Sequence, residues 1–344
     1  MKFVKSRYYN LNRIGMIFVG VWPYRKGKFV YIQKVLFFGI FGCFLASQVK
    51  QCLERIEHDW ATLNGKEFEI VKEYANISRF FTLAFLFTIL VVGCCIPIVQ
   101  FLPVILNVIF PSQTPRPFSR RLIIRMEFLI DEEKYFFAIL FYGAVGWTIG
   151  SVAIVSIGCS ILTFGYHTCA MFKIACYRME RAMEGCDGFD ITTQNTIRNG
   201  IISALNIHRE AIKFADIVQS NFMTFYFFII VACVASLVQA LYSHSLEEIF
   251  TTVSYISTLF MYMFWTNYAA QLITDHFDQI FTATYGCPWY MTSVQIQKLI
   301  VFILQRGTQP YARHIFSAFT LSLEGFATLV SASMSYFSVI YAAQ

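Results

Sequence analysis

Residues 313–343 carry the sequence RHIFSAFTLSLEGFATLVSASMSYFSVIYAA, which is apolar along most of its length and polar along one side. The polar side chains recur every three or four residues, which places them on one face of a helix: Ser317, Thr320, Glu324, Thr328, Ser331, Ser335 and Ser338. At ~1.5 Å per residue, residues 314–342 span about 43 Å, more than the ~30 Å hydrocarbon core of a bilayer. Lipid offers hydroxyls and carboxylates no hydrogen bonds, so this face must turn toward water or protein. The stretch predicts a transmembrane helix beside an aqueous path, with close helix packing as the alternative.

Composition indicates a membrane protein along the whole chain. Of the 344 residues, 57% are hydrophobic and 14% are charged, whereas soluble domains average about 25% charged residues. The net charge of +6 includes no basic block or stripe, so we expect no nucleic-acid partner. The ten cysteines lack the spacing of metal sites, and six lie in apolar segments: Cys43, Cys94, Cys95, Cys159, Cys169 and Cys233. We expect free thiols that pack as small apolar groups, with no metal and no cofactor.

Apolar segments long enough to cross a bilayer occur at six places: 29–52, 80–110, 135–172, 214–242, 249–273 and 314–342. The stretches between them contain no repeat, no low-complexity tract and no Gly/Ser linker. The pattern predicts an all-α polytopic membrane protein with one integral domain over residues 1–344.

Basic residues test the orientation, because cytoplasmic loops carry an excess of Lys and Arg. Seven lie in 1–28, four in 54–79, five in 111–134, six in 173–213 and three in 274–313. Strict alternation of six spans from a cytoplasmic amino terminus gives twelve inside and thirteen outside, which is no bias. Placing the amino terminus and residues 54–79 together in the cytoplasm gives twenty inside and five outside. The charges favour this arrangement, in which either the first segment does not span or one helix is missing before residue 79.

Motifs in the last third of the chain resemble, in order and spacing, the signature of the insect odorant receptor family. They are Ala283-Thr-Tyr-Gly-Cys-Pro-Trp-Tyr290, Gln305-Arg-Gly-Thr-Gln-Pro310, Phe319-Thr-Leu-Ser-Leu-Glu-Gly-Phe326 and Ser335-Tyr-Phe-Ser-Val339. Earlier stretches resemble the family too: Leu53 to Trp60, Asp131 to Phe136 and His167 to Glu180. The resemblance therefore covers nearly the whole chain.

This resemblance implies seven helices, a cytoplasmic amino terminus and an extracellular carboxyl terminus. In the family, the stretch similar to Leu53 to Trp60 follows the second helix, whereas here it follows the first apolar segment almost directly. We therefore expect the second of the usual seven helices to be missing, in agreement with the count of basic residues.

The resemblance also implies a ligand-gated, non-selective cation channel, assembled as a hetero-tetramer with the odorant co-receptor in the plasma membrane of olfactory sensory neurons. The family's last helix lines the pore, so Glu324, Thr328, Ser331 and Ser335 are expected to line it, with Val339 at the position of a hydrophobic gate. For Glu324, about 15 Å inside the predicted helix, a hydrogen-bonded structural role is the alternative.

The family's odorant site is an apolar pocket in the outer half of the bundle. At about that depth we expect six side chains to contact a small volatile organic ligand: Phe87, Val91, Phe141, Val145, Tyr255 and Leu259. The domain would then comprise a cytoplasmic amino-terminal segment (1–28), a helical bundle with the ligand pocket (29–273), a cytoplasmic anchor segment (274–313) and a pore-lining helix (314–342).

The anchor segment contains an amphipathic pattern over residues 289–306, which predicts a helix that ends near Gly307. In the family this region packs subunits together, and residues 173–184 and 274–285 would join it. A helix lying on the lipid surface is the alternative.

Other classes of protein fit less well. A G-protein-coupled receptor would place its amino terminus outside, against the seven basic residues of 1–28. A secondary transporter would show repeated halves, and an enzyme would need a motif that none of His167, His244 and His276 provides. The remaining alternatives are a truncated, non-conducting odorant receptor copy and a gustatory receptor-like channel.

Overall fold

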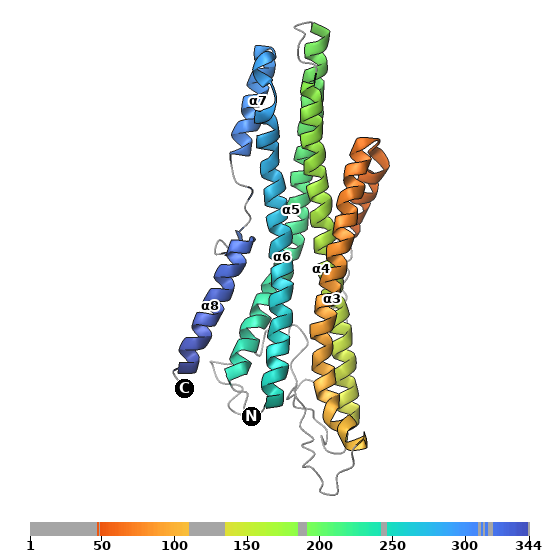
Figure 1. Ribbon diagram of the computed structural model, residues 1–344, viewed down its shortest axis with the longest axis vertical. Helices are drawn as coiled ribbons and strands as arrows, with labels where there is room; N and C mark the ends of the chain where they lie inside the picture. The colour runs from red at the N-terminus through yellow and green to blue at the C-terminus, as the bar shows by residue number, and fades with distance from the viewer. Residues whose placement is uncertain are drawn as a thin grey trace, which may run out of the picture. The chain divides into compact units, whose positions relative to one another are not determined.

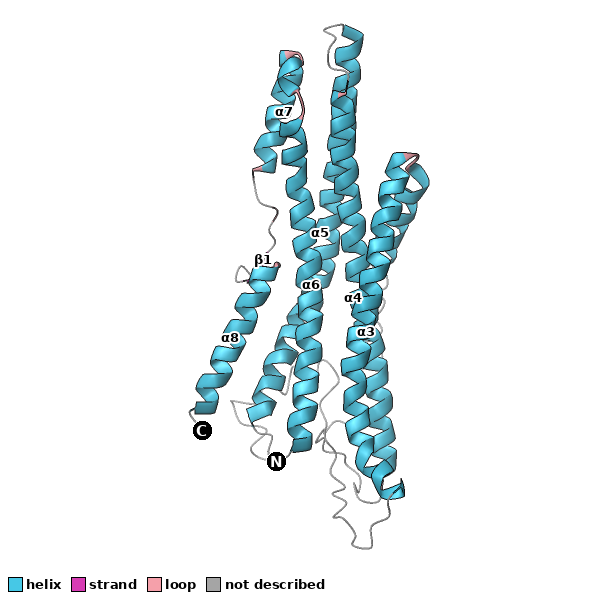
Figure 2. Cartoon of the chain, viewed as in Figure 1, coloured by secondary structure: helices cyan, strands magenta, loops and turns pink. Residues whose placement is uncertain are grey.

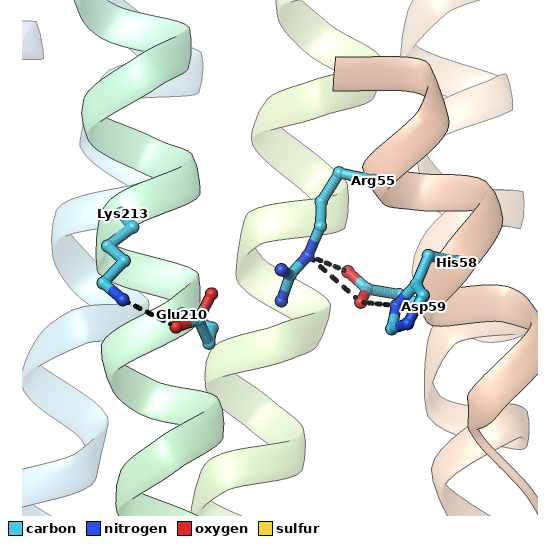
Figure 3. Close-up of polar contacts among 5 residues, drawn as sticks. All are labelled: Arg55, His58, Asp59, Glu210 and Lys213. Atoms are coloured by element: carbon cyan, nitrogen blue, oxygen red, sulfur yellow. Dashed lines mark hydrogen bonds and ion pairs between the residues drawn. The ribbon is translucent and has the colours of Figure 1, made fainter. Parts of the chain in front are cut away.

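The computed structural model describes residues 47, 49–109, 135–184, 191–241, 246–308, 311, 314–315 and 319–342. The predicted amino-terminal segment and most of the first apolar segment lie outside these residues. The chain divides into two compact units, Met1–Ala61 and Thr62–Gln344. In the first unit, residues 49–61 are helical, and Arg55 pairs with Asp59 one turn along the helix at 3.2 Å (Figure 3).

Long helices make up the second unit (Figures 1 and 2). They are α3 (Lys66–Ile109), α4 (Phe136–Met183), α5 (Ile191–Leu241) and α6 (Leu246–Gly286), followed by a short 3-10 turn η2 (Trp289–Met291) and α7 (Val294–Gly307). Two-residue strands β1 (His314–Ile315) and β2 (Phe319–Thr320) pair antiparallel before α8 (Leu323–Ala342). Helix α4 packs against α3, α5 and α6, and α6 also packs against α7 and α8. The predicted all-helical class is confirmed, with the strand pair as a minor addition.

Helix lengths set how far the bundle extends beyond a bilayer. Helices α3 to α6 contain 41 to 51 residues each, or roughly 60–75 Å at 1.5 Å per residue, about twice the hydrocarbon thickness. Three stretches of the described residues have the length and apolar composition to cross a membrane: Ile154–Met183, Ile191–Leu241 and Leu323–Ile340. The four predicted segments between residues 80 and 273 coincide with parts of α3 to α6, but the helices continue well past them.

Aromatic contacts join α3, α4 and α6. The Phe81 ring stacks on Tyr166 at 5.6 Å and meets Trp265 edge-on at 6.0 Å. Phe85, 1% exposed, meets Tyr262 edge-on and lies against Gly158, where an added Cβ would come within 2.4 Å of the Phe85 ring. Small residues at such crossings let membrane helices approach closely, so Gly158 provides the space that Phe85 fills.

A charged network joins α3, α4 and α5. Arg178 of α4 donates two hydrogen bonds to the Glu67 carboxylate of α3, at 2.6 and 2.7 Å, and one to Ser203 Oγ of α5, at 2.8 Å. A guanidinium that bonds a carboxylate through two parallel N–H groups is both strong and directional. The network therefore fixes three helices to one another at this level.

Helix α8 begins later than the sequence predicted. Residues 314–315 and 319–320 are extended, and Thr320 lies in β2, so the expected helix from residue 314 is wrong at the described positions before Leu323. Ser317 lies outside the described residues. Ser322 Oγ accepts a hydrogen bond from the Gly325 backbone N–H at 3.0 Å, which caps the helix at Leu323. A Cβ at Gly325 would lie 2.0 Å from the Thr320 carbonyl oxygen, so glycine is what allows the chain to turn this tightly into α8.

Candidate functional site

Two opposite faces distinguish α8. One face packs on the bundle: Leu329 is buried, and Phe326 meets Phe264 of α6 edge-to-face at 5.8 Å. The predicted polar face is exposed at each of its helical positions: Glu324, Thr328, Ser331, Ser335 and Ser338, with Val339 beside them at 67%. Phe326 and Ser335 are nine positions apart, about two and a half turns, and therefore lie on opposite sides of the helix. The polar face thus points away from the chain's own bundle.

Hydroxyls along this face share one hydrogen-bond pattern. Thr328 Oγ1 donates to the Glu324 carbonyl at 3.0 Å, Ser335 Oγ to the Ser331 carbonyl at 2.9 Å, and Ser338 Oγ to the Met334 carbonyl at 2.8 Å. Each hydroxyl hydrogen is thereby turned inward, and the oxygen lone pairs remain for other partners. A row of oxygen acceptors favours cations over anions in a pore.

Glu324 lies in the first turn of α8 and is exposed. Its expected depth of about 15 Å inside the helix was therefore wrong, because the helix starts at Leu323. A carboxylate in the first turn of a helix is stabilised by the positive end of the helix dipole. Whether Glu324 lines the pore or has a structural role, it would act at the amino-terminal end of α8.

The connection between α7 and α8 is held against the bundle by Tyr311. This residue is 6% exposed, and its hydroxyl donates to Asp216 of α5 at 2.9 Å. Thr274 of α6 donates to the Tyr311 carbonyl at 3.2 Å, and the Phe277 ring lies 5.2 Å from the Tyr311 ring. The connection is thus tied to α5 and α6 at Tyr311, before the strand pair and α8.

The side chains predicted to form the ligand pocket have different environments. Phe87, Val91, Phe141 and Val145 are exposed by 68%, 50%, 70% and 40%, Tyr255 is half-buried and Leu259 is 2% exposed. Exposure of the first four suits a surface that lipid, another subunit or a ligand covers. A shared pocket for the six stays a prediction.

A partly open cavity that the sequence pattern did not predict lies between α4, α5, α6 and Leu321, which precedes α8. Its volume is about 40 Å³. Its walls come from four parts of the chain: Ile161 of α4; Val218, Gln219, Met223 and Tyr226 of α5; Thr266, Ala269, Ala270 and Ile273 of α6; and Leu321. Gln219 is the one signal in the sequence that could have located it, because an amide inside an apolar membrane segment requires a polar partner.

The anchor helix α7 lies beside the carboxyl end of α6 (Figure 1). It ends at Gly307, as the amphipathic pattern predicted, and buries Ile296, Ile300 and Ile303. These side chains share one apolar cluster with residues of α4 and α5: Met179, Met183, Ile197, Ile201 and Ala204. Packing on the bundle is therefore favoured over a helix lying on lipid. Met179 and Met183 come from the stretch 173–184 that was expected to join this region, while the contribution from the start of α5 was missed. Packing between subunits stays a prediction.

The fold and the exposed polar face of α8 define a multi-pass helical membrane protein. Residues 36–334 match the family model described as 7tm Odorant receptor. The chain therefore belongs to the odorant receptor family, a family of receptors rather than enzymes.

Solved structures of insect olfactory receptors share this fold. The insect olfactory receptor OR5 from Machilis hrabei in complex with eugenol is 16% identical, with a TM-score of 0.57 and a match over 100% of both chains. A second structure of OR5 from Machilis hrabei is 15% identical, with a TM-score of 0.60 over 99% of this chain and 91% of that one. No curated protein sequence matches the chain.

Proposed function

We propose that this chain is the odour-binding subunit of a ligand-gated, non-selective cation channel, formed as a hetero-tetramer with the odorant co-receptor in the plasma membrane of olfactory sensory neurons. The observation that carries the proposal is the geometry of α8. Phe326 and Leu329 pack on the bundle, and the polar face on the opposite side, which includes Ser335, is left for an axis shared with other subunits. Membership in the odorant receptor family supports the same conclusion.

In this proposal the amino terminus is cytoplasmic and the carboxyl terminus extracellular, so α8 runs outward from Glu324 to Val339. The twenty basic residues assigned to the cytoplasmic side support this orientation. The hydroxyl oxygens then line the conduction path, and a ring of Val339 side chains closes it by excluding water.

The proposed ligand is a small volatile organic molecule. The related receptor OR5 was solved in complex with eugenol. This chain would bind its own ligand at the six residues predicted for the pocket, of which Tyr255 and Leu259 are the most buried. Contacts there would be mainly apolar, so shape would decide selectivity.

A second candidate is a truncated receptor copy that reaches no conducting state. It is favoured by one observation, the direct succession of the first apolar segment and the stretch from Leu53 to Trp60, which leaves no room for a second helix. A missing helix would remove one wall of the outer pocket. A gustatory receptor-like channel is the further alternative.

Whole-cell current separates these candidates. The chain is expressed with the odorant co-receptor and exposed to a panel of volatiles, and surface labelling is measured in the same cells. Odour-evoked cation current above that of the co-receptor alone is the expected result. Surface assembly without any response would favour the non-conducting copy, and failure to reach the surface would contradict the proposed channel.

A further inference from the structure

The cavity beside Leu321 is walled mainly by buried hydrocarbon. Val218, Ala269 and Ile273 are each 3% exposed and Leu321 is 8% exposed. Side chains of this kind leave a cavity dry unless polar groups hold water in it. The character of the cavity therefore depends on the few polar groups among its walls.

Gln219 is the wall residue that has a buried polar atom without a hydrogen-bond partner among the described residues. Its side chain is 9% exposed, and within the described part of the chain Oε1 has no hydrogen-bond partner. The other polar wall residues each have a partner: Thr266 Oγ1 donates to the Tyr262 carbonyl, and the Tyr226 hydroxyl accepts from Asn267 Nδ2, which leaves the first free to accept and the second free to donate. A buried acceptor left without a donor is costly, so Gln219 calls for a hydrogen-bond donor inside the cavity.

Size and polarity together select the ligand. We propose that this cavity is a second ligand site, which binds a short-chain alcohol through its hydroxyl to Gln219 and its alkyl group to the apolar walls. A volume of about 40 Å³ holds roughly three atoms of water size, at ~10–15 Å³ each, which matches ethanol. Water is the competing occupant, since a buried water makes two to four hydrogen bonds, typically about three.

The site also touches the start of the pore helix. Leu321 lies two residues before α8 and forms part of the wall, so an occupied cavity would press on the segment that positions α8. An effect of alcohol on odour-evoked current therefore follows, and this second step rests on the proposed channel function.

Binding can be measured without any current. Met223 lines the cavity, so the chain is produced with its co-receptor in lipid nanodiscs with ¹³C-methyl methionine, and the Met223 signal is assigned from Met223→Leu. Titration with ethanol is expected to shift the Met223 methyl resonance saturably. Met334, 57% exposed on α8, serves as the control and is expected to shift only linearly. A linear response at both methyls would overturn the proposal and would mean that the cavity holds water only.

Variants and a second probe test the hydrogen bond. Gln219→Leu should weaken ethanol binding about fivefold, the usual worth of one hydrogen bond. Ala270→Leu fills the cavity and should abolish the saturable shift, whereas Ala235→Leu on the exposed side of α5 should preserve it. Acetonitrile, of similar size but without a donor, should bind the unaltered chain at least several-fold more weakly than ethanol. Equal binding of the two probes would refute the role of Gln219 even if a variant failed to fold.

Current then distinguishes the two steps. If ethanol shifts Met223 saturably and alters odour-evoked current in the unaltered chain but not in Ala270→Leu, both steps hold. A saturable shift without any effect on current would leave the site intact and refute its coupling to α8.

Discussion

Removal of the Arg178 side chain tests whether α3, α4 and α5 are held together by one charged network. The guanidinium makes three hydrogen bonds of 2.6 to 2.8 Å, two of them to the Glu67 carboxylate. The Arg178 and Glu67 side chains are only 26% and 17% exposed, so solvent screens the pair weakly. Arg178→Met removes every donor, and Arg178→Lys retains the charge without the planar fork.

The expected loss follows from these contacts. Hydrogen bonds to charged groups contribute about 1.5–3 kcal/mol each, and breaking a fully buried ion pair costs about 3–5 kcal/mol. Because the pair is partly hydrated, we expect Arg178→Met to cost roughly 2–4 kcal/mol and Arg178→Lys roughly 1–2 kcal/mol. Much of the first cost comes from leaving Glu67 unpaired, so adding Glu67→Gln to Arg178→Met should recover part of the stability.

Thermal denaturation of the purified receptor complex measures this loss. At about 2–4 °C per kcal/mol, Arg178→Met should lower the Tm by roughly 4–16 °C. The matched control is Lys213→Met, which breaks the exposed pair with Glu210 at 2.8 Å (Figure 3), worth about 1 kcal/mol or less. Equal Tm changes in the two variants, or no recovery from Glu67→Gln, would refute the network.

Three further outcomes are expected. Gly325→Ala should lower surface assembly and the Tm, since its Cβ would meet the Thr320 carbonyl at 2.0 Å. The control Gly286→Ala has open space around its Cβ and should match the unaltered chain in surface assembly and in Tm. Burial lowers the pKa of His276 below 6.5, so the unfolded state binds the proton more readily and stability falls as the pH drops below about 6.5. Between pH 7.5 and 5.5 the Tm should therefore fall less in His276→Gln than in the unaltered chain. An identical fall in the two would count against this reasoning. Val339→Ser should raise current in the absence of odour, because a polar ring no longer excludes water, and an unchanged resting current would contradict a gate at this position.

Periodicity predicted the elements whose polar and apolar faces alternate cleanly. The end of α7 at Gly307 and the burial of one face of that helix followed from the amphipathic pattern. The polar face of α8 was also recognised correctly over its helical positions. The predicted helix was wrong at the described positions before Leu323, because periodicity alone does not reveal the Ser322 cap or the close approach of Gly325 to a carbonyl.

Charged and polar residues led the start of α5 and the contacts of Arg178 to be missed from the sequence. Residues 191–213 were taken as a polar stretch between segments, although they form the first turns of α5 and bury Ile197 and Ile201. Arg178 added to the polarity of the stretch before them, yet its charge is used in contacts between helices. Such pairing depends on residues more than a hundred positions apart, which the local pattern does not contain. The cavity at Gln219 was missed for the same reason, since three helices must meet before it exists.

The most direct test of the central claim compares two serines of α8 on opposite faces. Ser335 is exposed on the polar face, whereas Ser333 is half-buried on the packed face, where its hydroxyl donates to the Leu329 carbonyl at 2.8 Å. Each is replaced by cysteine, and odour-evoked current with the co-receptor is recorded before and after a charged, water-soluble thiol reagent. We predict block of the Ser335→Cys channel and no change in Ser333→Cys. Block of Ser333→Cys alone, or of neither variant despite normal current, would contradict a pore lined by the polar face of α8.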